Sequence, residues 1–201
     1  MVKRQIEDRG VKNPAVLEAM KEVPRHLFVP ERYRSEAYED HPLPIGLGQT
    51  ISQPYIVAFM TELLQLKPGD RVFELGTGSG YQAAVASRVA GEVFTVEIYR
   101  ELAASAEARL AGHGYSNVTV REGDGYFGWE EKAPFDAIIV TAAADHIPPP
   151  LLEQLRPGGR LVIPLGGPFS VQQLVMVNKD LKGRISERGV MLVRFVPLLG
   201  H

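Results

Sequence analysis

The pattern of apolar and polar positions changes its period repeatedly along this chain. Short apolar runs of strand length alternate with stretches in which apolar residues recur at helical spacing. The expected strands are residues 72–75, 91–96, 118–121, 135–141 and 160–165, and the expected helices between them include 81–89, 99–111 and 149–155. A regular alternation of this kind predicts five parallel strands in one sheet, with helices packed on its faces.

The N-terminal part of the chain has a helical pattern instead. Asn13 and Pro14 form a capped helix start, and Pro24 ends the helix. The stretch 25–38 is broken, and we expect its three arginines to form a solvated face. Proline and glycine punctuate residues 40–53, which predicts a loop. A helix follows, with one apolar face made by Ile56, Val57, Met60, Leu63 and Leu64.

The C-terminal part predicts two further strands, residues 172–177 and 189–196. The segment between them is polar and turn-like, so we expect an antiparallel pair. The sequence therefore predicts an α/β fold: a doubly wound, mostly parallel, Rossmann-like sheet with an antiparallel C-terminal strand pair and an N-terminal helical extension. We expect a single domain, 1–201, in which 1–53 form the extension and 54–201 the ligand-binding core.

A glycine-rich turn follows the first of these strands. Glu74 precedes Gly76, Gly78 and Gly80, whereas the dinucleotide pattern would need glycine at the position of Tyr81. A carboxylate there repels a pyrophosphate but suits a cationic ligand, such as S-adenosylmethionine with its ammonium and sulfonium groups. We expect the turn, including Thr77 and Ser79, to bind this ligand through its backbone. The alternative is an ordinary turn with Glu74 in solvent.

Two more acids end strands of the predicted sheet. Glu97 follows the glycine turn by about 20 residues, where an acid accepts hydrogen bonds from the ribose hydroxyls of a nucleoside. Asp124 and Gly125 follow the third strand, where a carboxylate can accept from the adenine amino group and glycine leaves space. The alternatives are a solvated strand end for Glu97 and a Gly-Asp-Gly turn for Asp124.

Composition narrows the classes of partner. The net charge of −2 gives no bulk attraction for nucleic acid or for an acidic membrane. The chain has no cysteine, its histidines show no paired spacing for a metal, and no apolar run reaches membrane-spanning length. The N-terminus is polar, without a visible signal peptide. We therefore expect a cytoplasmic monomer with no metal, no nucleic-acid partner and no membrane partner.

Two further stretches carry candidate chemistry. Ser52 precedes a helix, and it is either an N-cap or a group that acts on a substrate. No histidine or aspartate is spaced to make it a hydrolase nucleophile. Ala142, Ala143 and Ala144 follow the fourth strand and leave room above a ligand. The Asn/Asp-Pro-Pro-Tyr motif of many amino-methylating enzymes is absent there, which argues against a nucleobase or amide nitrogen as methyl acceptor.

Taken together, these motifs resemble the protein-L-isoaspartate O-methyltransferase family over nearly the whole chain. The glycine turn is shared by many methyltransferases, whereas Gln-Thr-Ile-Ser-Gln-Pro at 49–54 and Arg-Phe-Val-Pro-Leu at 194–198 are more specific. One departure is Ile98, where the family usually has a basic residue beside the ribose-binding acid.

The resemblance implies an S-adenosylmethionine-dependent enzyme that methylates the free α-carboxylate of L-isoaspartyl residues in damaged proteins and peptides, so that repair proceeds through a succinimide. It implies Ser52 as the catalytic group that orients this carboxylate, and it adds Gln49, Thr50 and Ile51 to the cofactor site. The acceptor site is expected among the 42–54 loop, Ala142 to Ala144, Val193 and Phe195. A small-molecule or RNA methyltransferase of the same fold is the alternative, and a cofactor-binding regulator without turnover is a third.

Overall fold

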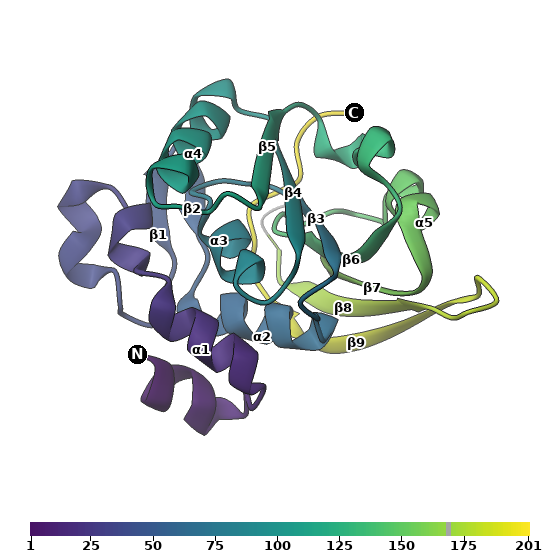
Figure 1. The fold of residues 1–201 in the computed structure, drawn as a ribbon, viewed down its shortest axis with the longest axis horizontal. Coiled ribbons are helices and arrows are strands. Elements are labelled where there is room, and N and C mark those ends of the chain that lie inside the picture. Colours follow the sequence, from purple (N-terminus) through teal and green to yellow (C-terminus); the bar gives the residue numbers. More distant parts are fainter. Residues whose placement is uncertain (168–169) are drawn as a thin grey trace.

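The main sheet has the doubly wound arrangement that the sequence predicts. The computed structural model describes residues 1–167 and 170–201, and within them seven strands form one sheet in the order β5-β4-β3-β6-β7-β8-β9 (Figure 1). Strands β3 to β7 run parallel, and β8 and β9 continue the sheet antiparallel to their neighbours. Their bounds are β3 Arg71–Leu75, β4 Glu92–Glu97, β5 Val118–Glu122, β6 Phe135–Val140, β7 Leu155–Leu165, β8 Gln172–Lys179 and β9 Ile185–Val193. The winding reverses between β3 and β6, which is the topological switch point.

Helices cover both faces of this sheet. Helices α2, α3 and α4 pack on one face, and α1 packs outside them against α2 and α3 (Figure 1). Helix α5 and two short 3-10 turns cover the other face together with Trp129. The bounds are α1 Pro14–Glu22, α2 Pro54–Leu64, α3 Tyr81–Ser87, α4 Arg100–Gly112 and α5 Pro149–Gln154, with 3-10 turns at Gly125–Phe127 and Glu130–Lys132.

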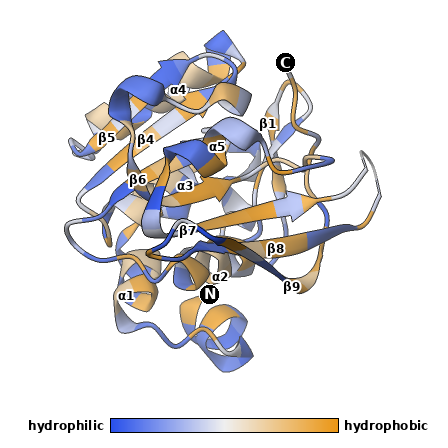
Figure 2. Ribbon diagram, turned by 90° about the vertical axis from the view of Figure 1, so that its right-hand side faces the viewer, coloured by the Kyte–Doolittle hydropathy of each residue, from blue (hydrophilic) through white to orange (hydrophobic). Residues whose placement is uncertain are grey.

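Apolar side chains fill the space between the layers. Hydrophobic residues predominate along the central strands, while α4 carries many hydrophilic ones (Figure 2). Phe73 of β3 stacks on Phe135 of β6 with ring centroids 5.2 Å apart. Small side chains in α3, including the fully buried Ala83 and Ala84, let this helix lie close to the sheet. None of the helices in the described residues is long and apolar enough to cross a membrane.

The start of α1 agrees with the prediction, because Asn13 Oδ1 accepts hydrogen bonds from the amides of Ala15 and Val16. The prediction for Arg25 is wrong: its side chain is fully buried. Its Nε donates to the carbonyl of Ala37 at 2.8 Å, and its guanidinium lies 5.0 Å from the ring centroid of Tyr81. Short helical turns complete the extension, at Val2–Ile6 (a π-helix), Glu7–Arg9, Arg25–Phe28 and Glu31–Glu36.

The segment predicted as a loop contains a small hairpin. Strand β1 (Leu43–Gly46) pairs antiparallel with β2 (Gln49–Ile51), and α2 begins shortly after. In α2, Val57, Met60 and Leu64 are buried as predicted, whereas Ile56 and Leu63 are only partly buried. The extension shares its apolar core with the sheet, but the division at residue 53 stays a prediction.

The C-terminal strands differ from the prediction in their ends. Strand β7 begins at Leu155, earlier than expected. The Pro-Gly-Gly segment at 157–159, which was expected as a turn, belongs to the strand, and the register with β6 shifts there. Strand β9 begins at Ile185 and ends at Val193, so it lies earlier in the chain than expected. The antiparallel pairing of β8 with β9 is as predicted.

Candidate active site

A cavity lies above the carboxyl ends of β3, β4 and β6, beside the switch point. It has an open volume of about 530 Å³, including its mouth. We call it the switch-point cavity. Six of the expected cofactor residues lie on its wall: Gln49, Thr50, Gly76, Gly78, Glu97 and Gly125. The wall also includes Ile98 and residues 196–199.

The glycine turn is shaped by contacts that exclude larger residues. Gly76 has φ 97° and Gly78 has φ 52°, which L-residues rarely adopt. A Cβ atom on Gly76 would also collide with Thr141 Oγ1. The amides of Gly76 and Thr77 both donate to the carbonyl of Val96, at 2.9 and 3.2 Å, so β4 holds the turn. Three other cofactor candidates, Ile51, Thr77 and Ser79, line a smaller pocket beneath the turn.

Glu97 connects the end of β4 to the glycine turn. Its Oε2 accepts a hydrogen bond from the amide of Gly78 at 2.8 Å, and its Oε1 accepts one from the amide of Tyr99 at 3.0 Å. The side chain is almost fully buried and lies on the cavity wall. A carboxylate offers about four acceptor sites, so Glu97 keeps capacity for the two hydroxyls of a ribose.

Glu74 occupies a different environment from the one expected. Its side chain is fully buried, and it does not line any of the cavities found in the described residues. Neither carboxylate oxygen has a hydrogen-bond partner among those residues. Burial raises the pKa of Glu74 to about 8. Burial therefore favours the neutral form of the Glu74 carboxyl, and the solvated alternative is wrong. The expected contact of Glu74 with the cofactor stays a prediction.

Asp124 and Gly125 have different environments in the structure. Asp124 Oδ1 accepts from the amide of Tyr126 at 2.9 Å and caps the Gly125–Phe127 turn, while Oδ2 accepts from the amide of His201. The carboxylate is not on the wall of the switch-point cavity, and its predicted contact with the adenine amino group stays a prediction. Gly125 does lie on that wall, and the space beside it is filled by Leu75.

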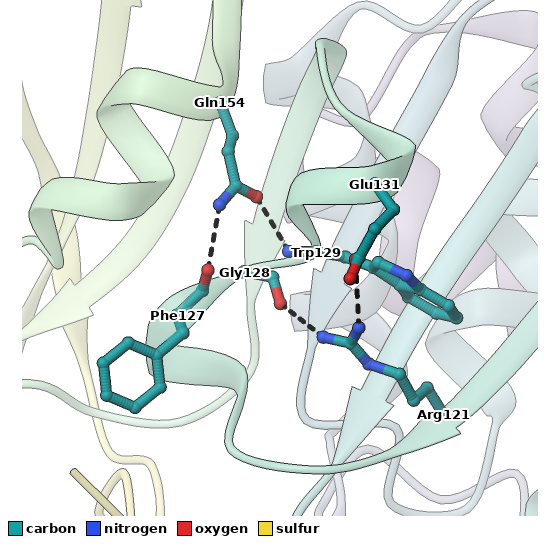
Figure 3. A network of polar contacts seen from close by, with 6 residues as sticks. All are labelled: Arg121, Phe127, Gly128, Trp129, Glu131 and Gln154. Atoms are coloured by element: carbon teal, nitrogen blue, oxygen red, sulfur yellow. Dashed lines mark hydrogen bonds and ion pairs between the residues drawn. The ribbon is translucent and has the colours of Figure 1, made fainter.

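A polar network fixes the chain that follows Gly125 (Figure 3). Gln154 of α5 accepts from the amide of Trp129 at 2.7 Å and donates to the carbonyl of Phe127 at 2.9 Å. Arg121 of β5 donates to the carbonyl of Gly128 at 2.8 Å. Side chains from two elements therefore satisfy backbone groups of one loop, which keeps the turn at Gly125 in place.

A second, larger hollow lies beside the first, and we call it the edge cleft. Its open volume is about 1560 Å³, including its mouth. One wall comes from residues around β2 and the start of α2, and the other from residues 191–197 after and within β9. Ser52, Val193 and Phe195 all lie on its walls, so the structure brings these predicted acceptor residues together.

Ser52 does not cap α2. The N-cap residue is Gln53, and no side chain caps this helix. Ser52 is partly buried, lines both the edge cleft and the pocket beneath the glycine turn, and its hydroxyl has no hydrogen-bond partner among the described residues. A hydroxyl placed in this way is available to a bound molecule.

The three alanines after β6 are placed differently from the prediction. Ala142 lines the switch-point cavity, whereas Ala143 and Ala144 line a separate hollow beside Tyr126 and His146. The amide and carbonyl of Ala143 are engaged by residues 196 and 198, and the amide of Ala144 donates to Pro164. Ala143 and Ala144 therefore do not line the edge cleft, and their part in acceptor binding stays a prediction.

Two threonines lie where the two hollows meet, and the sequence patterns indicate Thr50 but not Thr141. Thr50 and Thr141 each line the switch-point cavity, the edge cleft and the pocket beneath the glycine turn. Thr141 Oγ1 lies 2.7 Å from the carbonyl of Gly76 and 3.0 Å from that of Leu75, so it ties the end of β6 to the glycine turn. A polar residue at a strand end, just before the alanines, was the available signal.

The residues described contain no cluster of three or more His, Cys, Asp or Glu side chains that could hold a metal ion.

The doubly wound sheet, the acid-glycine turn after β3 and the acid at the end of β4 define the class of Rossmann-like, S-adenosylmethionine-dependent methyltransferases. The family model described as Protein-L-isoaspartate(D-aspartate) O-methyltransferase (PCMT) matches residues 1–201, and the chain belongs to this family.

Individual relatives agree with this assignment. The chain is 59% identical to protein-L-isoaspartate O-methyltransferase 2 of Shewanella sediminis, covering 100% of this chain and 82% of the relative. A solved protein-L-isoaspartate O-methyltransferase superimposes with a TM-score of 0.90 at 32% identity, covering 100% of this chain and 66% of that one. A putative enzyme of the same name from Plasmodium falciparum, in complex with S-adenosyl-L-homocysteine, gives a TM-score of 0.83 at 25% identity and covers 98% and 96%.

Proposed function

We propose that this protein transfers a methyl group from S-adenosylmethionine to the free α-carboxylate of L-isoaspartyl residues in damaged proteins and peptides. The ester then closes to a succinimide without further catalysis, and the succinimide opens to restore part of the normal chain. The observation that carries the proposal is the junction at Thr50 and Thr141, where a nucleoside-type cavity meets a cleft large enough for a peptide.

The residues of the switch-point cavity fit the cofactor. S-adenosylmethionine supplies an electrophilic methyl group on a sulfonium when it is bound. Glu97 holds the glycine turn through Gly78 and keeps acceptor sites for ribose hydroxyls. The absence of side chains at Gly76 and Gly78 gives a ligand close access to the backbone of the turn. Asp124 caps the turn that carries Gly125, and its carboxylate keeps acceptor capacity for the adenine amino group.

The acceptor chemistry explains why no strong base is needed. A carboxylate is already ionised at pH 7, so proton transfer contributes nothing to its attack on the methyl group. Rate enhancement then comes mainly from alignment at a near-attack distance. The hydroxyl of Ser52 is a neutral donor on the wall of the edge cleft, and it orients the carboxylate without neutralising it.

The alternative is a small-molecule or RNA methyltransferase of the same fold. An RNA substrate would favour a basic surface, which a net charge of −2 does not supply. The open volume of the edge cleft suits an extended peptide better than a single small molecule. We also propose that the protein works as a cytoplasmic monomer, without a metal ion and without nucleic-acid or membrane partners.

One experiment separates these functions. Purified protein is incubated with radiolabelled S-adenosylmethionine and either an isoaspartyl peptide or the same peptide with normal aspartate. We expect base-labile methyl ester on the isoaspartyl peptide alone. Equal labelling of both peptides, or transfer to RNA only, would reject the proposal. Cofactor binding without transfer to any acceptor would indicate a regulator.

A further inference from the structure

The edge cleft carries an asymmetric charge. Among the residues described on its walls, the charged side chains are Arg9 and Arg194, and none is acidic. The other lining residues are mostly apolar or neutral, including Val171, Leu192 and Phe195. A cleft that receives a peptide therefore presents only positive charge to it.

The two arginines are not equivalent. Arg9 forms an ion pair with Asp40 at 2.6 Å, and its guanidinium lies 3.7 Å from the ring centroid of Tyr55. Its charge is therefore largely compensated within the protein. Arg194 is exposed, and it has neither an ion-pair nor a hydrogen-bond partner in the part of the chain that the structure describes. The uncompensated charge of the cleft is thus at Arg194.

The position of Arg194 separates it from the reacting carboxylate. Val196 and Pro197 line both hollows, whereas Arg194 lines only the edge cleft. Residues 194–196 follow β9, and two residues of chain span at most about 7 Å. A peptide whose isoaspartyl group reaches the junction would place a neighbouring residue, not the reacting group, beside Arg194.

We propose that Arg194 is a specificity-determining residue that makes this enzyme favour isoaspartyl sites flanked by acidic residues. This inference rests on the proposed function and names the class of peptide that the site prefers. An exposed ion pair contributes modestly, and it is screened by salt. The charge also steers acidic peptides toward the cleft during encounter.

The test compares isoaspartyl peptides that differ only in the residues on both sides of the isoaspartate. Glutamate, isosteric glutamine and lysine are placed there, and kcat/KM is measured for each with labelled S-adenosylmethionine. For the natural protein at low ionic strength we expect the Glu peptide to exceed the Gln peptide by about two- to fivefold. The ratio should approach one at about 0.5 M salt.

Variants assign the effect to one residue. In Arg194→Gln the Glu-to-Gln ratio should fall to about one, and in Arg194→Glu it should fall below one while the Lys peptide gains. Arg188→Gln is the matched control, since Arg188 is an exposed arginine of β9, roughly 20 Å away along the extended chain, and does not line the cleft. It should keep the natural ratio.

Because each ratio is measured within one variant, a partly unfolded preparation does not change it. A natural ratio of one at low salt, or a ratio that persists in Arg194→Gln, would overturn this inference. If the neutral isoaspartyl peptide is methylated without any charge preference, only this inference fails. If no isoaspartyl peptide is methylated at all, the proposed function itself fails.

Discussion

The carboxylate of Glu97 accepts a hydrogen bond from the amide of Gly78 at 2.8 Å, so one side chain both holds the glycine turn and faces the switch-point cavity. Two backbone amides, those of Gly78 and Tyr99, orient the carboxylate. A side chain that is held in this way needs little further ordering to accept hydrogen bonds from a ligand.

Replacement of Glu97 by alanine should weaken cofactor binding. Loss of a charged acceptor costs about 1.5–3 kcal/mol, which raises the Kd for S-adenosylhomocysteine by roughly tenfold to a hundredfold. Glu97→Gln keeps one acceptor oxygen and should lose less. Isothermal titration calorimetry measures both Kd values. A Kd for Glu97→Ala close to that of the natural protein would contradict the ribose assignment.

Ser52→Gly and Ser52→Ala should be slow but stable. Since Ser52 does not cap α2, both substitutions should change the free energy of unfolding by less than about 0.5 kcal/mol. Loss of a positioned donor lowers kcat by up to the order of 10²-fold, and the effect is smaller where the nucleophile is charged before it binds. Denaturant titration and kcat for an isoaspartyl peptide are the measurements. Full activity in Ser52→Gly would remove Ser52 from the mechanism.

Stability should fall as the pH rises through the titration of Glu74. Burial raises its pKa in the folded protein from 4.5 to about 8, so the folded state binds the proton more tightly than the unfolded state. The stability that this proton contributes is fully present below pH 4.5, the pKa of the unfolded state, and it is lost as the pH rises toward 8. The free energy of unfolding falls by up to about 1.4 kcal/mol per pH unit in this range. The isosteric Glu74→Gln variant lacks the effect. Thermal unfolding without cofactor, from pH 5 to 8, should show a steeper decline for the natural protein, and parallel curves would refute the assignment.

Gln154→Ala should reduce cofactor affinity from a distance. The change leaves the amide of Trp129 and the carbonyl of Phe127 without their partner, which costs about 1–3 kcal/mol of stability. The loosened loop carries Gly125, so the KM for S-adenosylmethionine should rise while kcat at saturation stays nearly constant. Glu153→Ala, an exposed neighbour on α5, is the control and should change neither quantity. An unchanged KM in Gln154→Ala would show that the network is only structural.

The sequence predicts the central parallel strands β3, β4 and β6 well because each is a short, mostly apolar run that is buried on both faces. The Asn13 cap is equally local, and it is found as expected. Arg25 was misassigned because its burial depends on Tyr81 and Ala37, which lie elsewhere in the chain. The β1–β2 hairpin was missed since its strands are very short and lie among prolines and glycines.

The candidate site was predicted in part for a similar reason. Gly76, Gly78 and Glu97 were found because their spacing follows from the βα unit itself. Spacing could not separate two roles of Asp124, because a strand-end carboxylate can cap the next turn as readily as it can face a ligand. Thr141 was missed since its importance comes from its contact with the carbonyls of Leu75 and Gly76, which local spacing does not reveal.

The shared wall at Thr50 and Thr141 has a consequence for inhibitor design. Two ligands that meet there bind at adjoining sites, so a short tether between an adenosyl group and an aspartyl-peptide fragment spans both hollows. The second fragment then binds at a high effective concentration, and the loss of translational freedom is incurred once. A bisubstrate compound of this kind should bind far more tightly than either fragment and should distinguish this enzyme from methyltransferases whose acceptor cleft has another shape.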